Sequence, residues 1–273
     1  MQEMLEVDPA MLQNIDDEDY ASSGYDTTTA SLTASINQYI FENGRRYHTY
    51  FGIDKNILPT DETEQDRLDL HHEIFLLLLR GSLFSAPIQN PQRILDVGTG
   101  TGIWAIDMAD EFPSAEVIGN DLSCTKPGGY VQLCEVGGEL YCDDGTLTDD
   151  NALKIAFDIL NKEAMPKIGR PPATRENMTE RLQKAGFMDI VALDFKHPFG
   201  PWPKDKRQKR IGAMNMLNME TGIESYFMAA ATRILGMEVQ KAEKYCKDAF
   251  AALKNKNFHT YNYYYVVYGR KPE

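Results

Sequence analysis

The sequence lacks long apolar segments. Its longest apolar run, Ile74–Leu79, has six residues and ends at Arg80. A membrane-spanning helix needs about 20 apolar residues. The first ten residues, MQEMLEVDPA, also have neither the basic start nor the apolar stretch of a signal peptide. We therefore expect a soluble protein without a membrane partner, located in the cytoplasm.

Cysteine and positive charge are both scarce. The four cysteines form no C-x-x-C pair, so we expect no zinc or other metal site and a reduced, intracellular chain. Lys and Arg number 28 against 41 Asp and Glu, which gives a formal net charge of −13. Nucleic-acid binding depends on neutralising phosphates with Lys and Arg. We therefore expect no nucleic-acid partner.

The N-terminal segment has no basic residue. The first 44 residues carry nine acidic side chains and no Lys or Arg. Residues 15–34 mix charge with Ser, Thr and Gly and show no apolar period, which is typical of disordered segments. We interpret residues 1–34 as an acidic disordered arm. Because 42% of the chain is hydrophobic, residues 35–273 can bury a core and are predicted to form one domain.

Apolar residues at helical spacing predict two helices ahead of the first strand. One begins near Ser35 and has one apolar face, formed by Ile36, Tyr39 and Ile40. The other begins at Asp61, which forms a capping pair with Glu64, and Gly81 ends it. The two helices predict a helical lid over residues 35–84.

A glycine-rich motif follows the first strand. Ile94–Val97 is predicted to be a short buried strand, residues 98–102 (GTGTG) a loop, and residues 103–112 a helix. A second strand over residues 115–122 contains Asp121 near its end. A strand, glycine loop, helix and strand ending in an acid are typical of a nucleotide-binding unit. We therefore predict a cofactor-binding core over residues 93–136.

The form of the motif separates classes of cofactor. Glycines let the backbone turn tightly and approach a ligand where a Cβ would collide. Asp121 is placed to bind both ribose hydroxyls. Ile103 stands where the dinucleotide pattern requires Gly or Ala, so an NAD-linked oxidoreductase is a weaker alternative. The D-x-G-x-G-x-G form that starts at Asp96 instead suits an amino-acid-bearing nucleoside. An ordinary strand–turn–helix with no ligand is the remaining alternative.

Further elements are predicted in the C-terminal half. Helical patterns occur near 149–164, 174–185 and, in three stretches, between 204 and 254, and strands are expected near 188–195 and 258–269. Residues 200–255 are interpreted as a helical insertion on the substrate side. The run Lys204–Arg210 contains five basic residues, which favour a solvated helix face, with a nuclear import signal as the alternative.

The chain resembles the fungal class I methyltransferases related to the LaeA-type regulator of secondary metabolism. The resemblance is carried by NGRRYHTY (43–50), DETEQDRLDLHH (61–72), ILDVGTGTGIWAIDMADEFPSAEVIGNDLS (94–123), KPGGYVQLCE (126–135), GRPP (169–172), GPWPKD (200–205) and VVYGRKP (266–272). It implies a Rossmann-like α/β fold, S-adenosylmethionine as the cofactor and a small-molecule acceptor. A catalytically impaired regulator that acts through a protein partner in the nucleus is the alternative. The expected cofactor-binding residues are Asp96, Gly98, Thr99, Gly100, Gly102 and Asp121.

The predicted sheet is short of two strands. Only residues 122–125 separate Asp121 from Lys126, where the resemblance implies two more strands and their crossover helices. One strand–helix–strand unit takes about 30 residues or more, so roughly 50–60 residues are absent. The resemblance implies that they would supply the acid that reads the adenine. The first strand must then pair with residues 130–136, or the sheet has a gap, or residues 115–122 and 130–136 form a hairpin.

No catalytic residue is assigned from the sequence. No Ser-His-Asp or Cys-His set is recognisable. Many methyltransferases need no covalent nucleophile, because an acceptor held in line with the methyl group supplies much of the rate. The resemblance places Arg45–Tyr50, which includes His48, near the cofactor, although a surface or core-edge histidine is the simpler interpretation. His71 and His72 are expected to pack or to face solvent. Substrate contacts are expected at Trp202 and in the helices that follow it.

Overall fold

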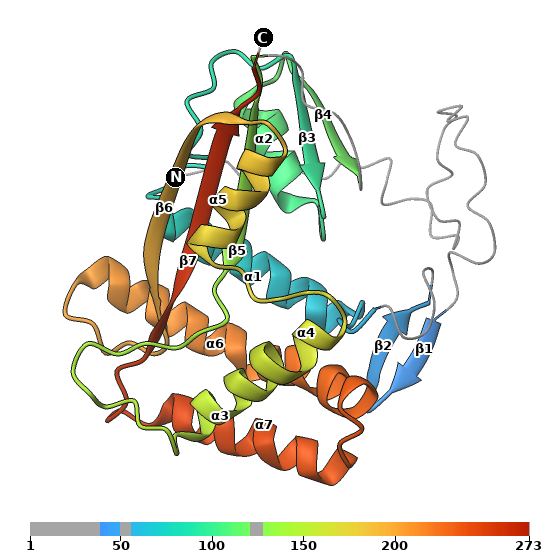
Figure 1. Ribbon diagram of the computed structural model, residues 1–273, viewed down its shortest axis with the longest axis vertical. Helices are drawn as coiled ribbons and strands as arrows, with labels where there is room; N and C mark the ends of the chain where they lie inside the picture. Colours follow the sequence, from blue (N-terminus) through green and yellow to red (C-terminus); the bar gives the residue numbers. More distant parts are fainter. Residues whose placement is uncertain (1–38, 50–55, 121–127, 273) are drawn as a thin grey trace, which may run out of the picture.

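The computed structural model describes residues 39–49, 56–120 and 128–272. The predicted acidic arm and Asp121 lie outside these residues. In Figure 1 the long strands occupy the upper part of the view and most of the helices gather at their lower ends. Within the described ranges, no helix combines the length and the apolar character needed to cross a membrane.

Residues 39–48 form a β-hairpin where the helix predicted from Ser35 would continue, so the prediction of a wholly helical lid is wrong over these residues; Ser35 itself lies outside the described residues. Strand β1 (Tyr39–Glu42) pairs antiparallel with β2 (Arg45–His48). Between them, Asn43 and Gly44 have φ values of 51° and 75°. Two successive residues in this left-handed region form the tight turn that Asn-Gly favours. The turn therefore decides the local structure, whereas the apolar period of the flanking residues is too short to do so.

The predicted order of strand, glycine loop, helix and second strand is confirmed over the described residues. Strand β3 (Arg93–Val97) leads through the glycine loop into helix α2 (Ile103–Glu111), and β4 (Glu116–Asn120) lies parallel to β3. Helix α2 forms the crossover that parallel strands require. It packs against β4 and leaves the carboxyl ends of both strands on the same side.

A second sheet contains three strands in the order β5–β7–β6. Strand β5 (Tyr130–Val136) and β6 (Met188–Pro198) both pair antiparallel with β7 (Tyr261–Arg270), which lies between them. The central position buries β7 on both faces. This explains why its sequence, YNYYYVVYGR, is apolar and aromatic almost without interruption.

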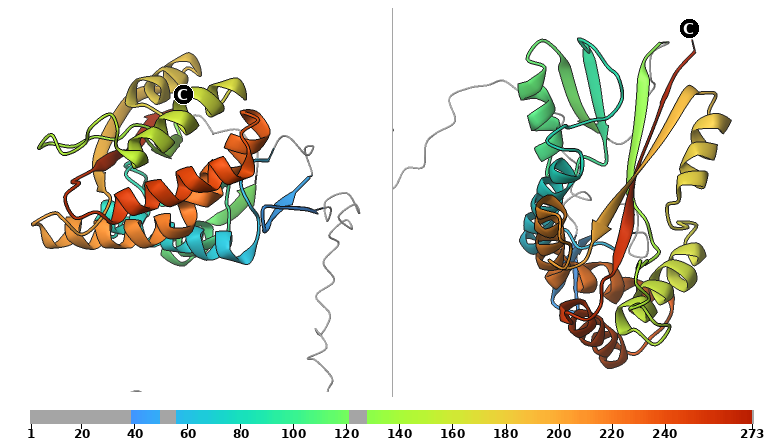
Figure 2. Two further views of the ribbon diagram at one scale, coloured as in Figure 1. Left: turned by 90° about the horizontal axis from the view of Figure 1, so that it is seen from below. Right: turned by 90° about the vertical axis from the view of Figure 1, so that its left-hand side faces the viewer.

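The two sheets are not hydrogen-bonded to each other, and β3 and β4 stand apart from β5 (Figure 2, right). Pairing of β3 with β5 and a hairpin between β4 and β5 are therefore both wrong, and the third alternative, a gap in the sheet, holds. The space corresponds to the absent strand expected beside β3. Val97 and Ile118 on the smaller sheet are 59% and 45% exposed, because nothing among the described residues covers them there.

Helices cover both faces of the three-stranded sheet. Helix α1 (Glu62–Leu78) and α6 (Lys206–Ala229) pack on one face, against Tyr264 and Val266 of β7. Helix α5 (Arg175–Lys184) packs on the other face, against Tyr265 and Val267. The basic run at the start of α6 is partly structural, because Nη1 of Arg207 donates to the carbonyl oxygen of Leu77 at 3.0 Å and closes the end of α1.

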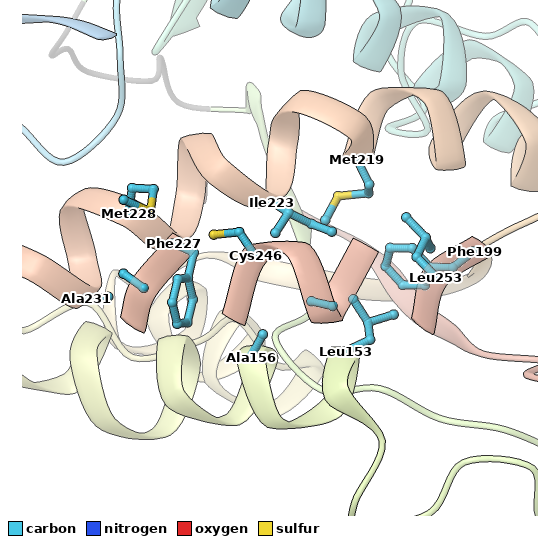
Figure 3. Close-up of a cluster of buried hydrophobic side chains, with 12 residues drawn as sticks. Leu153, Ala156, Phe199, Met219, Ile223, Phe227, Met228, Ala231, Cys246 and Leu253 are labelled. Carbon is cyan, nitrogen blue, oxygen red and sulfur yellow. The ribbon is translucent and has the colours of Figure 1, made fainter. Parts of the chain in front are cut away.

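A helical layer lies at the far end of the long strands (Figure 1). It contains α3 (Ala152–Asp158), the π-helix η3 (Ile159–Ala164), α4 (Met165–Lys167), the end of α6 with the π-helix η4 (Ala230–Ile234), and α7 (Val239–Lys254). Figure 3 shows the cluster that joins α3, α6 and α7, with Phe227 and Cys246 at its centre. The helices predicted in this part of the chain are confirmed.

Candidate functional site

The glycine loop depends on three glycines for its conformation. Gly98, Gly100 and Gly102 have φ values of 80°, 57° and 84°, a region that residues with a Cβ rarely adopt. The amide of Gly102 donates to the carbonyl oxygen of Thr99 at 2.8 Å, and Gly102 is the N-cap residue of α2. The sequence therefore uses glycine here because the backbone must reverse between β3 and α2.

The loop leaves open space where a ligand could approach. A Cβ added to Gly98 or Gly102 would meet no heavy atom within 4 Å. Thr99 is different: its side chain lies against β4, where a Cβ on Gly119 would come within 2.9 Å of Oγ1 of Thr99. Any contribution of Thr99 to a ligand site would therefore come from its backbone. Asp96 is half-buried in β3, paired in register with Gly119.

Helix α1 fastens the loop to the rest of the molecule. A Cβ on Gly100 would lie 3.6 Å from Cδ1 of Leu68 in α1. Oγ1 of Thr101 donates to Oδ1 of Asp69 at 2.6 Å. Nε2 of His72 lies 2.8 Å from Oδ2 of Asp107 in α2. His72 is therefore a packing residue, as predicted, and α1 holds the loop from one side.

An ion-pair network ties the hairpin to α1 and α6. Asp61 caps α1 by accepting from the amide of Glu64 at 3.0 Å, which confirms its predicted role. The carboxylate of Asp61 also accepts from Nε and Nη2 of Arg45 at 2.7 and 2.8 Å, and Arg45 donates in turn to Ser225 of α6. Glu64 does not complete the capping pair but binds buried Arg67. Arg45 thus fixes the hairpin beside the helices.

A cavity of about 970 Å³ lies between the three-stranded sheet and the helical layer. Gly98 is among its lining residues, so the cavity reaches the glycine loop. Much of the wall is apolar and comes from α3, η3 and α6, with Phe157, Leu160, Met219, Ile223 and Phe227 among the lining residues. Several of these also belong to the cluster in Figure 3, so the cavity is built into the main core.

Two histidines are among the polar residues of this wall. His197, at the end of β6, is 2% exposed, and the rings of His197 and His71 lie 6.4 Å apart between centroids. Burial lowers the pKa of His197 to about 4 and the pKa of His71 to about 3. Both imidazoles are therefore neutral near pH 7. His71, expected to pack or to face solvent, in fact lines the cavity.

Comparison with known proteins identifies the family. A family model described as a methyltransferase domain matches residues 68–164. Methyltransferase pytC of Aspergillus terreus is 32% identical over 274 aligned positions, covering 81% of this chain and 84% of pytC. The secondary metabolism regulator LAE1 of Cochliobolus heterostrophus is 31% identical, covering 87% of this chain and 96% of LAE1. The chain belongs to the fungal LaeA-like methyltransferases.

A third LaeA-like relative is the protein-methionine methyltransferase laeA of Emericella nidulans, 30% identical over 89% of this chain and 79% of that protein. The Rossmann-like class I fold predicted from the sequence is thereby confirmed, with its β3–α2–β4 unit in the expected place.

The alignments also measure what this LaeA-like chain lacks. Its part of the alignment with pytC, 81% of 273 residues, is about 221 residues. About 53 of the 274 aligned positions therefore face no residue of this chain. The size agrees with the 50–60 residues predicted to be absent.

Proposed function

We propose that this LaeA-like chain is an S-adenosylmethionine-dependent methyltransferase that methylates a small molecule of secondary metabolism in the cytoplasm. The observation that carries the proposal is that the cavity reaches Gly98 of the glycine loop. A cofactor held on the loop would face an acceptor held in the cavity. The cavity volume lies in the usual range for small-molecule sites, roughly 300–1,000 Å³.

The residues present fit this cofactor. The backbone at Gly98 and Gly102 has space beside it that a side chain would fill, and the N-terminal amides of α2 follow at once. The methionine end of the cofactor would be held by Asp96, Gly98, Thr99, Gly100 and Gly102. The ribose would be held by Asp121, which lies outside the described residues. S-adenosylmethionine supplies an electrophilic methyl group when bound. The chain's own contribution would be to position an acceptor and to exclude water with the apolar walls of the cavity.

The test is a titration of the purified chain with cofactor, in which binding is measured by calorimetry or by thermal shift. We expect S-adenosylmethionine or its demethylated product to bind more tightly than NAD. Equal or stronger stabilisation by NAD would refute the cofactor assignment.

A matched pair of variants separates the site from the backbone strain. Gly98 and Gly145 have nearly the same φ, 80° and 77°, and both have open space at the Cβ position. Gly98→Ala and Gly145→Ala should therefore lose similar stability. Only Gly98→Ala should lose affinity for S-adenosylmethionine, by about tenfold or more, because its methyl group enters the ligand's space. Equal affinities in the two variants would remove the loop from the site.

A second candidate is a regulator with weak or no catalysis that acts through a protein partner in the nucleus. The gap between the two sheets favours it, since no strand of the described residues lies between β3 and β5. The resemblance implies that the missing segment would also have supplied the acid that reads the adenine. Two of the relatives are named for regulation and for methylation of a protein methionine. Tight cofactor binding by the short chain would count against this candidate, and a chain that folds without binding cofactor would favour it.

A further inference from the structure

A buried chain of hydrogen bonds fixes the protonation of His197. Nδ1 of His197 lies 3.0 Å from Oδ1 of Asn262, and Nδ2 of Asn262 donates to the carbonyl oxygen of Gly137 at 3.1 Å. The contact with Gly137 sets the orientation of the amide, because the reverse orientation would oppose two oxygens. Oδ1 of Asn262 can only accept, so Nδ1 of His197 carries the proton. Nε2 of the neutral ring is therefore a hydrogen-bond acceptor.

This acceptor has no partner within the described part of the chain. Nε2 of His197 is buried and makes no hydrogen bond there. The same holds for Oδ1 of Asn218, on α6, and for Nδ1 of His71. All three residues line the cavity. Buried polar atoms are normally hydrogen-bonded, so three such atoms on one cavity wall point to a ligand that supplies the missing partners.

The surroundings define the kind of ligand. The acceptor whose character is fixed, Nε2 of His197, requires a hydrogen-bond donor. The side-chain amide of Asn218 adds a second polar group without a partner among the described residues. The three charged residues that line the cavity, Glu135, Arg170 and Arg181, are all exposed and belong to its rim. The enclosed part offers aromatic and aliphatic side chains and neutral polar atoms. It therefore suits an uncharged aromatic molecule that carries hydroxyl groups.

We propose that the cavity binds a neutral aromatic alcohol whose hydroxyl group donates a hydrogen bond to Nε2 of His197, with the side-chain amide of Asn218 as a second polar contact. Asn262 is a positioning residue, since it acts only through Nδ1 of His197. The identification of this alcohol as the methyl acceptor rests on the proposed function. In that role, Nε2 of His197 would accept the hydrogen bond of the hydroxyl and take up its proton as the oxygen gains the methyl group.

The experiment compares two probes that differ in the donor: 2-naphthol and its methyl ether, 2-methoxynaphthalene. Each is titrated into the full chain without cofactor, and binding is followed by probe fluorescence. We expect 2-naphthol to bind about tenfold more tightly, because one hydrogen bond to a buried acceptor is gained. In His197→Phe the two affinities should become equal, whereas His259→Gln, which changes a half-exposed histidine outside the cavity, should keep the preference.

A measurement on the unaltered chain keeps the test valid if His197→Phe does not fold. With ¹⁵N-labelled histidine, 2-naphthol should shift the Nε2 resonance of His197, and 2-methoxynaphthalene should not. Equal binding of the two probes, no binding of either, or an unmoved resonance would overturn the proposal. If the chain binds the probes but not S-adenosylmethionine, only the proposed function is refuted, because the probes are titrated without cofactor.

Discussion

Asp61 offers a quantitative test of how the hairpin is held. Its side chain is only 15% exposed and accepts hydrogen bonds from Arg45 and from the amides of Arg46 and Glu64. The hydrogen bond from Arg45 lowers the pKa of Asp61 from 3.8 to about 2. Each pKa unit corresponds to about 1.4 kcal/mol, so the ionised form contributes about 2 kcal/mol to the free energy of unfolding.

The sign of the pH dependence follows from the lowered pKa. The stabilisation is fully present above the unfolded pKa of 3.8 and is lost as the pH falls towards about 2. Asp61→Asn keeps an N-cap acceptor for the amide of Glu64 but removes the charge that pairs with Arg45. We expect the variant to be about 2 kcal/mol less stable at pH 7, with a difference that shrinks below about pH 4.

Urea denaturation at pH 7, 5, 4 and 3 measures this difference directly. Asp66→Asn is the control, because Asp66 is exposed on the same helix, and it should change the stability by less than about 0.5 kcal/mol at each pH. Asp61→Ala should lose about 1 kcal/mol more than Asp61→Asn, since the cap is also removed. An Asp61→Asn variant as stable as the parent at pH 7, or a difference that does not vary with pH, would refute the reasoning.

Three further changes test the loop, the core and the gap. Gly119→Ala places a Cβ 2.9 Å from Oγ1 of Thr99, so the variant should be about 1–3 kcal/mol less stable to unfolding. It should also bind S-adenosylmethionine more weakly in a thermal-shift titration, and unchanged binding would show that Thr99 does not shape the loop. Phe227→Ala, at a residue 3% exposed in the cluster of Figure 3, should cost about 3–5 kcal/mol in urea denaturation, whereas Leu217→Ala, 56% exposed on the same helix, should cost less than about 0.5 kcal/mol. Inserting a relative's segment between Asp121 and Lys126 should raise the melting temperature and strengthen S-adenosylmethionine binding about tenfold or more; equal values for both forms would show that the gap has no cost.

The sequence predicted the parts of the fold that depend on local patterns. One glycine loop between two apolar segments predicts the order of strand, loop, helix and strand from Ile94 to the strand before Asp121, and the structure contains these elements in that order. The hairpin is also encoded locally, because Asn43-Gly44 is a strong turn signal and the apolar period beside it is too short to specify a helix. Local sequence patterns therefore suffice to predict most of the β3–α2–β4 unit.

The cavity was not predictable in the same way. His71, His197 and Asn262 come from one helix and two strands that meet only through long-range pairing of β6 with β7 and packing of α1 on them. The last strand contains one indication of a polar group in the cavity, because Asn262 is the one amide side chain in this aromatic-rich strand. Such a residue in a buried strand indicates a hydrogen-bond network, but the sequence does not say with which partner.

The separation of the two sheets has a consequence for motion. The unit β3–α2–β4 is joined to the remaining described structure by α1 and by single contacts such as Nε1 of Trp104 to the carbonyl oxygen of Leu83, with no ladder of backbone bonds to β5. Units with few connections open locally before the whole protein unfolds. The amides of β3 should therefore exchange with solvent deuterium faster than those of β7. A ligand that binds only the closed unit has an apparent affinity equal to its intrinsic affinity multiplied by the closed fraction. Because such a ligand stabilises the closed unit, its binding on the glycine loop will slow the exchange of the β3 amides.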